Sequence, residues 1–150
     1  RQRQVEEAQQ KLVGEVLRYW REGYGSEYNP HRQHAFNRLQ VVSSLEDAVK
    51  AVEELGESRP LLVSTAARQH PGSIGYQVLR GIIHQEGRNV LLLFGTGWGL
   101  AQTVIDNCDL VLEPISGTGD YNHLSVRSAV AIILDRLVGE KWWTVSLSYD

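Results

Sequence analysis

The chain has 150 residues, of which 42% are hydrophobic and 22% charged, and its formal net charge at pH 7 is −3. This composition is typical of an ordered globular protein with a sizeable core, and the negative charge excludes nucleic-acid binding through bulk charge alone. No apolar run approaches the roughly 20 residues of a membrane helix and no signal peptide opens the chain, so we expect a cytoplasmic protein with no membrane partner.

The amino-terminal part begins with an amphipathic helix. Apolar residues recur at intervals of three and four over residues 5–20, the spacing of one helix face. Glycines and a proline then predict a loop over residues 23–37. Residues 39–42 predict a short strand.

That loop carries a mixed basic and aromatic cluster, made up of Tyr28, His31, Arg32, His34, Phe36 and Arg38. Cations and rings together can contact phosphates and stack on nucleobases. The competing interpretation is a solvated loop with ordinary surface cations. Because the two histidines have no further ligand cluster nearby, we expect no metal site.

Helix and strand signals alternate from there on. Ser44 with Asp47 resembles a capping box at a helix start, and Gly56 ends that helix. The elements that follow are a strand over residues 60–64, a long loop over 65–73 and a helix over 76–86.

The most informative stretch is LLLFGTGWGL at residues 91–100. Residues 90–94 predict the central strand, which runs into Gly95, Gly97 and Gly99. Glycine tolerates positive φ and lets a ligand approach the main chain, so such a turn after a parallel strand suits a nucleotide-like cofactor. A role in packing alone is the competing interpretation.

Two known nucleotide-binding patterns do not fit this turn. A phosphate-binding P-loop is excluded because no lysine lies between Lys50 and Lys141. A dinucleotide fingerprint needs its third glycine one residue further on and normally opens its domain, although Glu113 stands where its acidic residue would be.

The last third of the chain ends in a long apolar helix. The expected elements are a helix over residues 100–107, a strand over 110–112, a glycine-rich loop over 113–123, a helix over 124–138 and an edge strand over 142–149. Cys108, the one cysteine, excludes a disulfide within the chain and a cysteine-rich zinc site. It is interpreted as a packed residue rather than a catalytic thiol.

Strands that alternate with helices specify an α/β fold with a parallel sheet, in which ligands gather at the carboxyl ends of the strands. We expect the loops over residues 65–73, 95–99 and 113–123 to meet there. No repeat or linker suggests a second domain, so residues 1–150 are expected to form one domain.

Three segments together resemble the SPOUT superfamily of RNA methyltransferases: LLLFGTGWGL, LVLEPI at residues 110–115 and DYNHLSVRSAVAIIL at residues 120–134. LLVSTAAR at residues 61–68 extends the resemblance to a small bacterial branch found fused to, or beside, tRNA guanine methyltransferases. The resemblance implies a Rossmann-like sheet with a deep carboxyl-terminal trefoil knot, a rare exception to the rule that chains do not thread. It also implies a homodimer that acts on tRNA or rRNA.

The resemblance further implies S-adenosylmethionine as the cofactor, held in a bent shape mainly by main-chain groups. Adenine suits an apolar slot with backbone donors and acceptors at its edge. The residues implied by position are Ser64, Thr65 and Ala66 at the pocket edge; Gly95, Thr96, Gly97 and Gly99 beside the ribose and methionine; Leu112, Glu113 and Ile115 around the adenine; and Asn122, Leu124 and Ser125 in the knot.

Methyl transfer from a sulfonium is an in-line displacement, so the enzyme mostly positions the acceptor and removes its proton. Asp120 and His123 are the candidate bases, and Arg68 and Arg127 are candidates to orient an RNA phosphate or the acceptor. Three of them have a structural alternative: Asp120 as a turn cap, His123 as a loop residue with its hydrogen bonds satisfied, and Arg127 as an ion-pair partner of Asp135 or Glu113. Ser125 is interpreted as a helix cap rather than a nucleophile.

Two departures from the family pattern leave the methylated atom open. The glycine turn is shorter than in the branch that methylates ribose hydroxyls and lacks the glutamate usual there, and His123 stands where an asparagine is common. A non-catalytic knotted module that binds RNA or regulates is therefore the alternative function. The chain starts in a helix without any methionine, and family members carry a preceding strand-and-helix unit, so we expect the natural protein to extend further toward its amino terminus.

Overall fold

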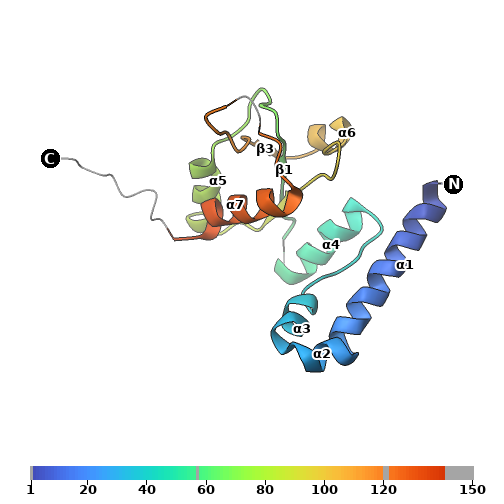
Figure 1. Cartoon of the computed structure of the whole chain (residues 1–150). Helices are drawn as coiled ribbons and strands as arrows, with labels where there is room; N and C mark the ends of the chain where they lie inside the picture. Colours follow the sequence, from blue (N-terminus) through green and yellow to red (C-terminus); the bar gives the residue numbers. More distant parts are fainter. Residues whose placement is uncertain (1, 57, 120–121, 141–150) are drawn as a thin grey trace. The chain divides into compact units, whose positions relative to one another are not determined.

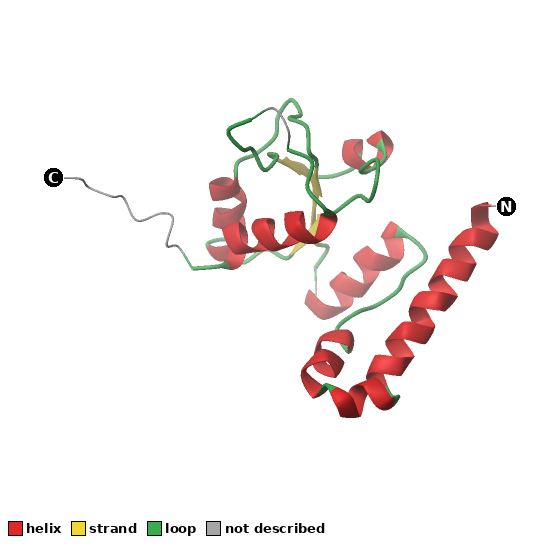
Figure 2. Ribbon diagram, in the orientation of Figure 1, coloured by secondary structure: helices red, strands yellow, loops and turns green. Residues whose placement is uncertain are grey.

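The computed structural model describes residues 2–56, 58–119 and 122–140 (Figure 1). The chain divides into two compact units, Arg1–Ala48 and Val49–Asp150. The first unit is helical, and the second holds the sheet (Figure 2). Asp120 and the predicted strand over residues 142–149 lie outside the described residues.

The helical unit contains α1 (Gln2–Arg21), α2 (Tyr24–Tyr28) and α3 (Pro30–Phe36). The helix predicted over residues 5–20 is confirmed, whereas the loop predicted over residues 23–37 is wrong for most of its length. Asn29 separates α2 from α3, and its side chain accepts a hydrogen bond from Arg32 N at 3.0 Å. Proline at the first helical position needs no N–H partner, so Pro30 starts a helix here instead of preventing one.

Aromatic rings and two long polar side chains hold these helices together. The rings of Trp20 and Phe36 stack with centroids 5.9 Å apart. Arg21 Nε donates to Phe36 O at 3.0 Å, and Gln33 Nε2 donates to Arg21 O at 2.8 Å. A Cβ on Gly25 would lie 2.7 Å from the Trp20 ring, so α2 approaches α1 through a residue that lacks a side chain.

The strand predicted over residues 39–42 is wrong. These residues pair with no strand of the described chain, although Arg21 Nη2 donates to Leu39 O. The next prediction is confirmed: α4 (Leu45–Gly56) begins after Ser44, whose Oγ accepts from Asp47 N at 3.1 Å. A polar cap of this kind satisfies one of the unpaired N–H groups at a helix start.

The sheet consists of three parallel strands in the order β2-β1-β3, which confirms the predicted α/β class. They are β1 (Leu61–Thr65), β2 (Val90–Leu93) and β3 (Leu110–Leu112). The prediction that residues 90–94 form the central strand is wrong, because β1 lies between the other two. Its four leading residues are all buried, as a strand paired on both sides requires, whereas β2 is only half-buried.

Helices α5 (Tyr76–His84), α6 (Gln102–Asp106) and α7 (Val126–Val138) confirm the three helices predicted in this unit. The core joins the sheet to α5 and α7 and consists of Leu61, Val63, Leu79, Leu112, Ile133 and Leu137. None of the described helices is long and apolar enough to cross a membrane.

The carboxyl end of α7 is fixed by side chains from α5. Arg80 Nη1 donates to Arg136 O at 3.0 Å, and its Nη2 donates to Gly139 O at 2.8 Å. His84 Nε2 donates to Leu137 O at 2.9 Å. These donors satisfy carbonyls that a helix end leaves unpaired, and a cation is favourable at that pole of the helix dipole.

Candidate functional site

The three predicted loops leave the sheet at one edge, because the strands are parallel (Figure 1). Two hydrogen bonds connect them there. Thr65 Oγ1 donates to Leu93 O at 2.8 Å and joins the ends of β1 and β2. Asn122 Nδ2 donates to Ala67 O at 2.5 Å and ties the loop before α7 to the loop after β1. The loops after β1 and β3 are therefore in contact, and the loop after β2 starts beside the end of β1.

The glycines after β2 divide into two kinds. A Cβ on Gly95 would lie 2.1 Å from the carbonyl carbon of Gly99, so Gly95 is needed for the turn itself. Gly97 and Gly99 have φ of +55° and +88°, and no atom lies within 4 Å of a Cβ built on either. The Gly99 N–H closes the turn on Thr96 O at 3.1 Å. Open space beside main chain of this kind fits a cofactor held by backbone groups.

The side chains at the end of β1 face their neighbours in the sheet. Ser64 is fully buried, with its Oγ 3.5 Å from Leu110 O, and Thr65 is occupied by the bond to β2 described above. Ala66 is partly buried. The main chain of residues 64–66 is thus what this segment can offer to a ligand, in line with the main-chain contacts that the resemblance implies.

The end of β3 and the segment after it are largely buried or hydrogen-bonded within the fold. Leu112 is fully buried and Ile115 packs against the core. Glu113 N donates to Ile74 O at 2.9 Å, and Glu113 Oε1 accepts from Tyr76 N at 3.2 Å. The Glu113 carboxylate therefore caps the start of α5, where a negative charge is favourable.

The loop before α7 is more open. His123, Leu124 and Ser125 are exposed, and Asn122 is partly buried. Ser125 Oγ accepts from Ser128 N at 3.3 Å, which confirms the interpretation of Ser125 as a helix cap.

Three of the four proposed catalytic residues lie on described parts of this edge. Arg68, His123 and Arg127 are exposed, and neither arginine forms an ion pair within the described residues. The carboxylate partner expected as the alternative for Arg127 is thus not found among them. The ion pair between Arg59 and Asp109, at 3.4 Å, lies before β1 and β3, at the opposite end of the strands.

Trp98 is a further exposed residue of this site that was not predicted from the sequence. This residue occupies the glycine turn between Gly97 and Gly99, and its relative exposure is 105%. The signal available was a large apolar ring between two glycines, in a turn too short to cover it.

Cys108 is a packed thiol. Its Sγ donates to Val104 O at 3.2 Å. Burial raises its pKa above the ordinary value, an effect that a hydrogen bond with Ser64 partly offsets. A raised pKa is the opposite of what a nucleophilic thiol needs, so the packing interpretation is favoured.

The basic and aromatic cluster of the helical unit forms an exposed surface. Tyr24 and Tyr28 are exposed and stack with centroids 6.4 Å apart. Arg32 lies 4.6 Å from the centroid of the Trp20 ring, and Arg38 Nη2 lies 3.3 Å from His34 Nε2. Phe36 packs on Trp20 rather than facing solvent, and His31 is exposed.

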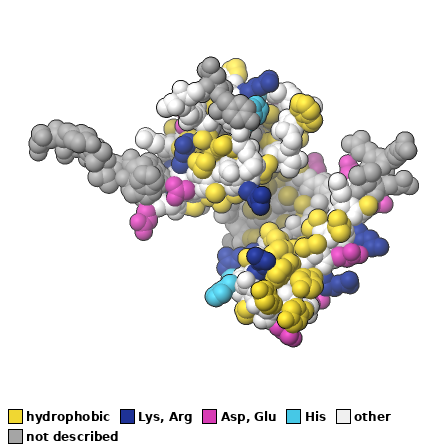
Figure 3. Space-filling model, viewed as in Figure 1, with side chains coloured by type: hydrophobic (Ala, Val, Ile, Leu, Met, Phe, Trp, Pro, Cys, Tyr) yellow, Lys and Arg dark blue, Asp and Glu magenta, His cyan; other side chains and the backbone are white. Residues whose placement is uncertain are grey.

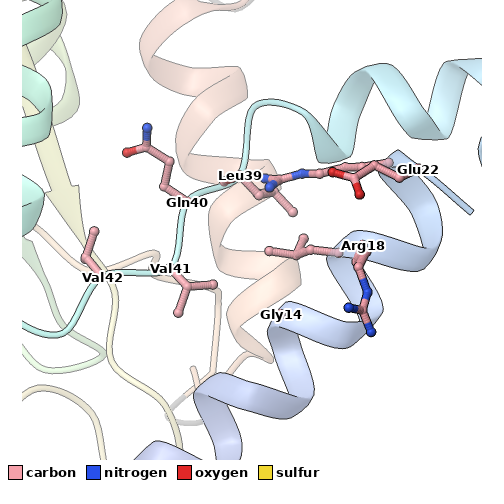
Figure 4. Close-up of a pocket in the computed structure, with 9 residues that line it drawn as sticks. Gly14, Arg18, Glu22, Leu39, Gln40, Val41 and Val42 are labelled. Carbon is pink, nitrogen blue, oxygen red and sulfur yellow. Dashed lines mark hydrogen bonds between the residues drawn. The ribbon is translucent and has the colours of Figure 1, made fainter.

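An open hollow of about 450 Å³ lies in the same helical unit, between α1 and the extended residues 39–42 (Figure 4). It is lined by Gly14, Leu17, Arg18, Arg21, Glu22, Leu39, Gln40, Val41 and Val42. None of these residues belongs to the three loops, so the hollow is not the predicted cofactor site. Within the described residues, no three histidine, cysteine or acidic side chains are grouped to hold a metal ion.

Comparison with known proteins gives relatives over most of the chain. An uncharacterized protein of Aquifex aeolicus is 40% identical over 131 residues, 87% of this chain and 64% of its own length. Two proteins named tRNA (guanine-N(1)-)-methyltransferase, from Oleidesulfovibrio alaskensis and Nitratidesulfovibrio vulgaris, are 41% and 40% identical over 134 residues. The match covers 89% of this chain but 31% of each of theirs.

Residues 4–139 match the family described as SAM-dependent RNA methyltransferase, where SAM is S-adenosylmethionine. The match includes all three strands and the loops that follow them. The chain therefore belongs to the family of SAM-dependent RNA methyltransferases, and S-adenosylmethionine is its cofactor.

Proposed function

We propose that this chain binds S-adenosylmethionine at the carboxyl edge of its sheet and transfers the methyl group to a nucleotide of tRNA or rRNA. The glycine turn is the observation that supports this location for the cofactor. Gly97 and Gly99 combine positive φ with open space, where a side chain would occupy the room of a ligand.

Three main-chain segments hold the cofactor in this proposal: residues 64–66, residues 95–97 together with Gly99, and residues 112–115. The side chains of Ser64, Thr65 and Glu113 are hydrogen-bonded within the fold, and Gly99 N donates to Thr96 O, so each segment is fixed by at least one hydrogen bond before a ligand arrives. A site built in advance binds with less loss of entropy than one that must order itself.

The bound cofactor supplies a methyl group on a positively charged sulfur, which the acceptor atom of the RNA displaces in line. Asp120 and His123 are the candidates to take a proton from that acceptor. Arg68 and Arg127 are exposed cations on the same edge, suited to orient an RNA phosphate. The two relatives named as tRNA methyltransferases favour tRNA, and their greater length supports a second tRNA methyltransferase domain that is fused or adjacent.

The resemblance leads us to propose a trefoil knot and a homodimer as well. The bond from Asn122 to Ala67 supports close passage of the loop before α7 by the loop after β1. On and before α7, Leu124, Leu134 and Val138 are 45%, 41% and 56% exposed, an apolar surface that a second subunit can cover. The mass in solution, measured by light scattering at micromolar concentration, tests the dimer.

Cofactor binding is tested by titration calorimetry with S-adenosylmethionine on the matched variants Gly97→Val and Gly87→Val. Both glycines have positive φ, +55° and +65°, and neither has an atom within 4 Å of its Cβ position. Strain is therefore similar, but Gly87 lies before β2 at the other end of the strand. We expect more than tenfold weaker binding in Gly97→Val and little change in Gly87→Val; equal effects would refute the location.

Methyl transfer is tested separately with labelled cofactor and undermethylated total RNA. Transfer of the labelled methyl group to RNA supports an enzyme. Loss of this transfer in His123→Ala or Arg127→Ala, with cofactor affinity retained, supports the proposed catalytic roles of these two residues. Tight cofactor or RNA binding without any label in RNA would instead favour the non-catalytic module.

A further inference from the structure

Trp98 has the highest exposure of the described large hydrophobic side chains, at 105%. Tryptophan is normally among the most buried side chains on average, because its large apolar surface gains from removal from water. A fully exposed indole at a ligand-binding edge therefore points to a partner that covers it in the working complex.

The turn fixes the backbone that carries the indole. Trp98 is the third residue of a four-residue turn closed by the hydrogen bond from Gly99 N to Thr96 O, and it lies between two glycines with positive φ. The backbone of Gly95 packs directly under Gly99. A short closed turn presents its tip with little conformational freedom to lose on binding.

The loops at this end of the sheet match RNA better than a protein surface. Among the described residues of the loops that follow the three strands, the large hydrophobic side chains that are exposed are Trp98, at 105%, and Leu124, at 45%. Protein interfaces need a contiguous apolar core, which these loops do not offer. They offer exposed cations instead: Arg68 follows β1 and Arg127 lies in the first turn of α7. A flat ring accompanied by cations is the arrangement that binds unpaired nucleotides.

We propose that Trp98 is a stacking platform for an unpaired nucleobase of the RNA substrate, beside the proposed cofactor site. The inference rests on the proposed function, since it places the RNA at the same edge as the cofactor. The ring selects unpaired over duplex RNA with little preference for base identity, because every base has a face that can stack.

Three substitutions separate stacking from simple apolar contact. Trp98→Phe keeps an aromatic face, Trp98→Leu keeps apolar bulk without one, and Trp98→Ala removes both. Affinity is measured for an unmodified tRNA transcript and for an RNA duplex of similar length, and cofactor affinity is measured by calorimetry. We expect Trp98→Ala and Trp98→Leu to weaken tRNA binding by roughly 5- to 150-fold, with Trp98→Phe within about threefold of wild type and cofactor affinity unchanged. Leu55→Ala, which removes another highly exposed apolar side chain, serves as the control with no expected effect.

Each other result overturns the inference in a recognisable way. Equal tRNA affinity in Trp98→Ala and wild type refutes it and leaves the proposed function intact. Weaker cofactor binding in Trp98→Ala assigns the ring to the cofactor, and loss of a dimer assigns it to a subunit interface. If wild-type protein transfers no methyl group and binds no RNA, the proposed function itself fails.

Discussion

The two units of the chain reach stability by different means. In the sheet unit, Val63, Leu79, Leu112 and Leu137 are fully buried, whereas the helical unit buries Leu17 and no other described large hydrophobic residue. Hydrophobic side chains gather on the surface of the helical unit instead (Figure 3). Those that are exposed are Leu12, Val13, Val16, Tyr19, Tyr24, Tyr28, Leu39, Val41 and Val42.

This difference in burial indicates which unit is rigid enough to hold a cofactor site. Burial of apolar surface is the main stabilising term in folding, so the sheet unit provides rigid strand ends for a cofactor site. The helical unit depends more on helix caps, ring stacking and hydrogen bonds such as that from Gln33 to Arg21. Regions with few buried apolar contacts open at lower free energy, so the two units should differ in hydrogen-exchange protection.

The largest effect is expected from a cavity in the sheet unit. Leu79→Ala removes a fully buried side chain of the core, which typically lowers the free energy of unfolding by about 2–5 kcal/mol. Leu12→Ala, at a side chain 62% exposed, should change it by less than about 0.5 kcal/mol. Hydrogen exchange of the β1 and α1 amides measures the stability of each unit separately. Similar losses of stability in Leu79→Ala and Leu12→Ala would contradict the difference between the two units.

The sheet was predictable because periodicity and burial agree there. Residues 110–112 were assigned correctly as a strand, and α5 and α7 start within two residues of the predicted helices. The helical unit was less predictable. Gly23 and Pro30 predicted a loop, yet each sits at a helix start, where a missing Cβ or N–H is tolerated. Residues 39–42 have strand-like composition but no strand to pair with, which a local pattern cannot reveal.

The loops that form the candidate site could be predicted from the sequence, whereas the contacts and exposure of their side chains could be predicted less well. Parallel strands bring loop starts to one edge, so the meeting of the loops followed from the fold class. The cap that Glu113 provides to Tyr76 N could not be foreseen, since it joins residues 37 positions apart. The exposure of Trp98 depends on turn closure rather than composition. Trp98 was therefore missed, although it lies inside the motif that pointed to the cofactor.

The next effect concerns the end of α7. Arg80→Ala removes the hydrogen bonds to Arg136 O and Gly139 O at the carboxyl end of α7. Hydrogen bonds made by charged groups are each worth about 1.5–3 kcal/mol. We expect the free energy of unfolding of the sheet unit to fall by an amount near the lower end of that range, because water can reach the freed carbonyls. Arg88→Ala, at an exposed arginine after α5, is the control. A loss no larger than that of the control would show that α7 does not depend on this contact.

A cap in each unit permits a direct comparison. Asn29 caps α3 and Ser125 caps α7, and replacing such a residue by alanine typically costs about 1 kcal/mol. If the units are stabilised as described, Asn29→Ala should reduce protection throughout the helical unit, whereas Ser125→Ala should affect only the first turn of α7. Hydrogen exchange followed by mass spectrometry distinguishes these patterns. If the two variants reduced protection to the same extent throughout their units, the units would not differ in how they are stabilised.

The smallest effect is a pH dependence in the sheet unit. Burial raises the pKa of Cys108 above that of an unfolded thiol, about 8.5. The unfolded chain then loses this proton first, so the contribution to stability is complete below about pH 8.5 and is lost as pH rises through the folded pKa. Burial also raises the pKa of Tyr76, an effect that Arg136 partly offsets, which extends the loss to higher pH.

The single cysteine makes this loss measurable. The expected size is below about 1 kcal/mol, because the thiol is only partly buried and solvent screens its charge. Urea unfolding between pH 7 and pH 10 should show wild-type stability declining more steeply than that of Cys108→Ala, while Tyr76→Phe should flatten only the upper end of the profile. Parallel profiles for wild type and Cys108→Ala would show that the thiol titrates equally in both states. The hydrogen bond between Ser64 and Cys108 would then make no difference to how the stability depends on pH.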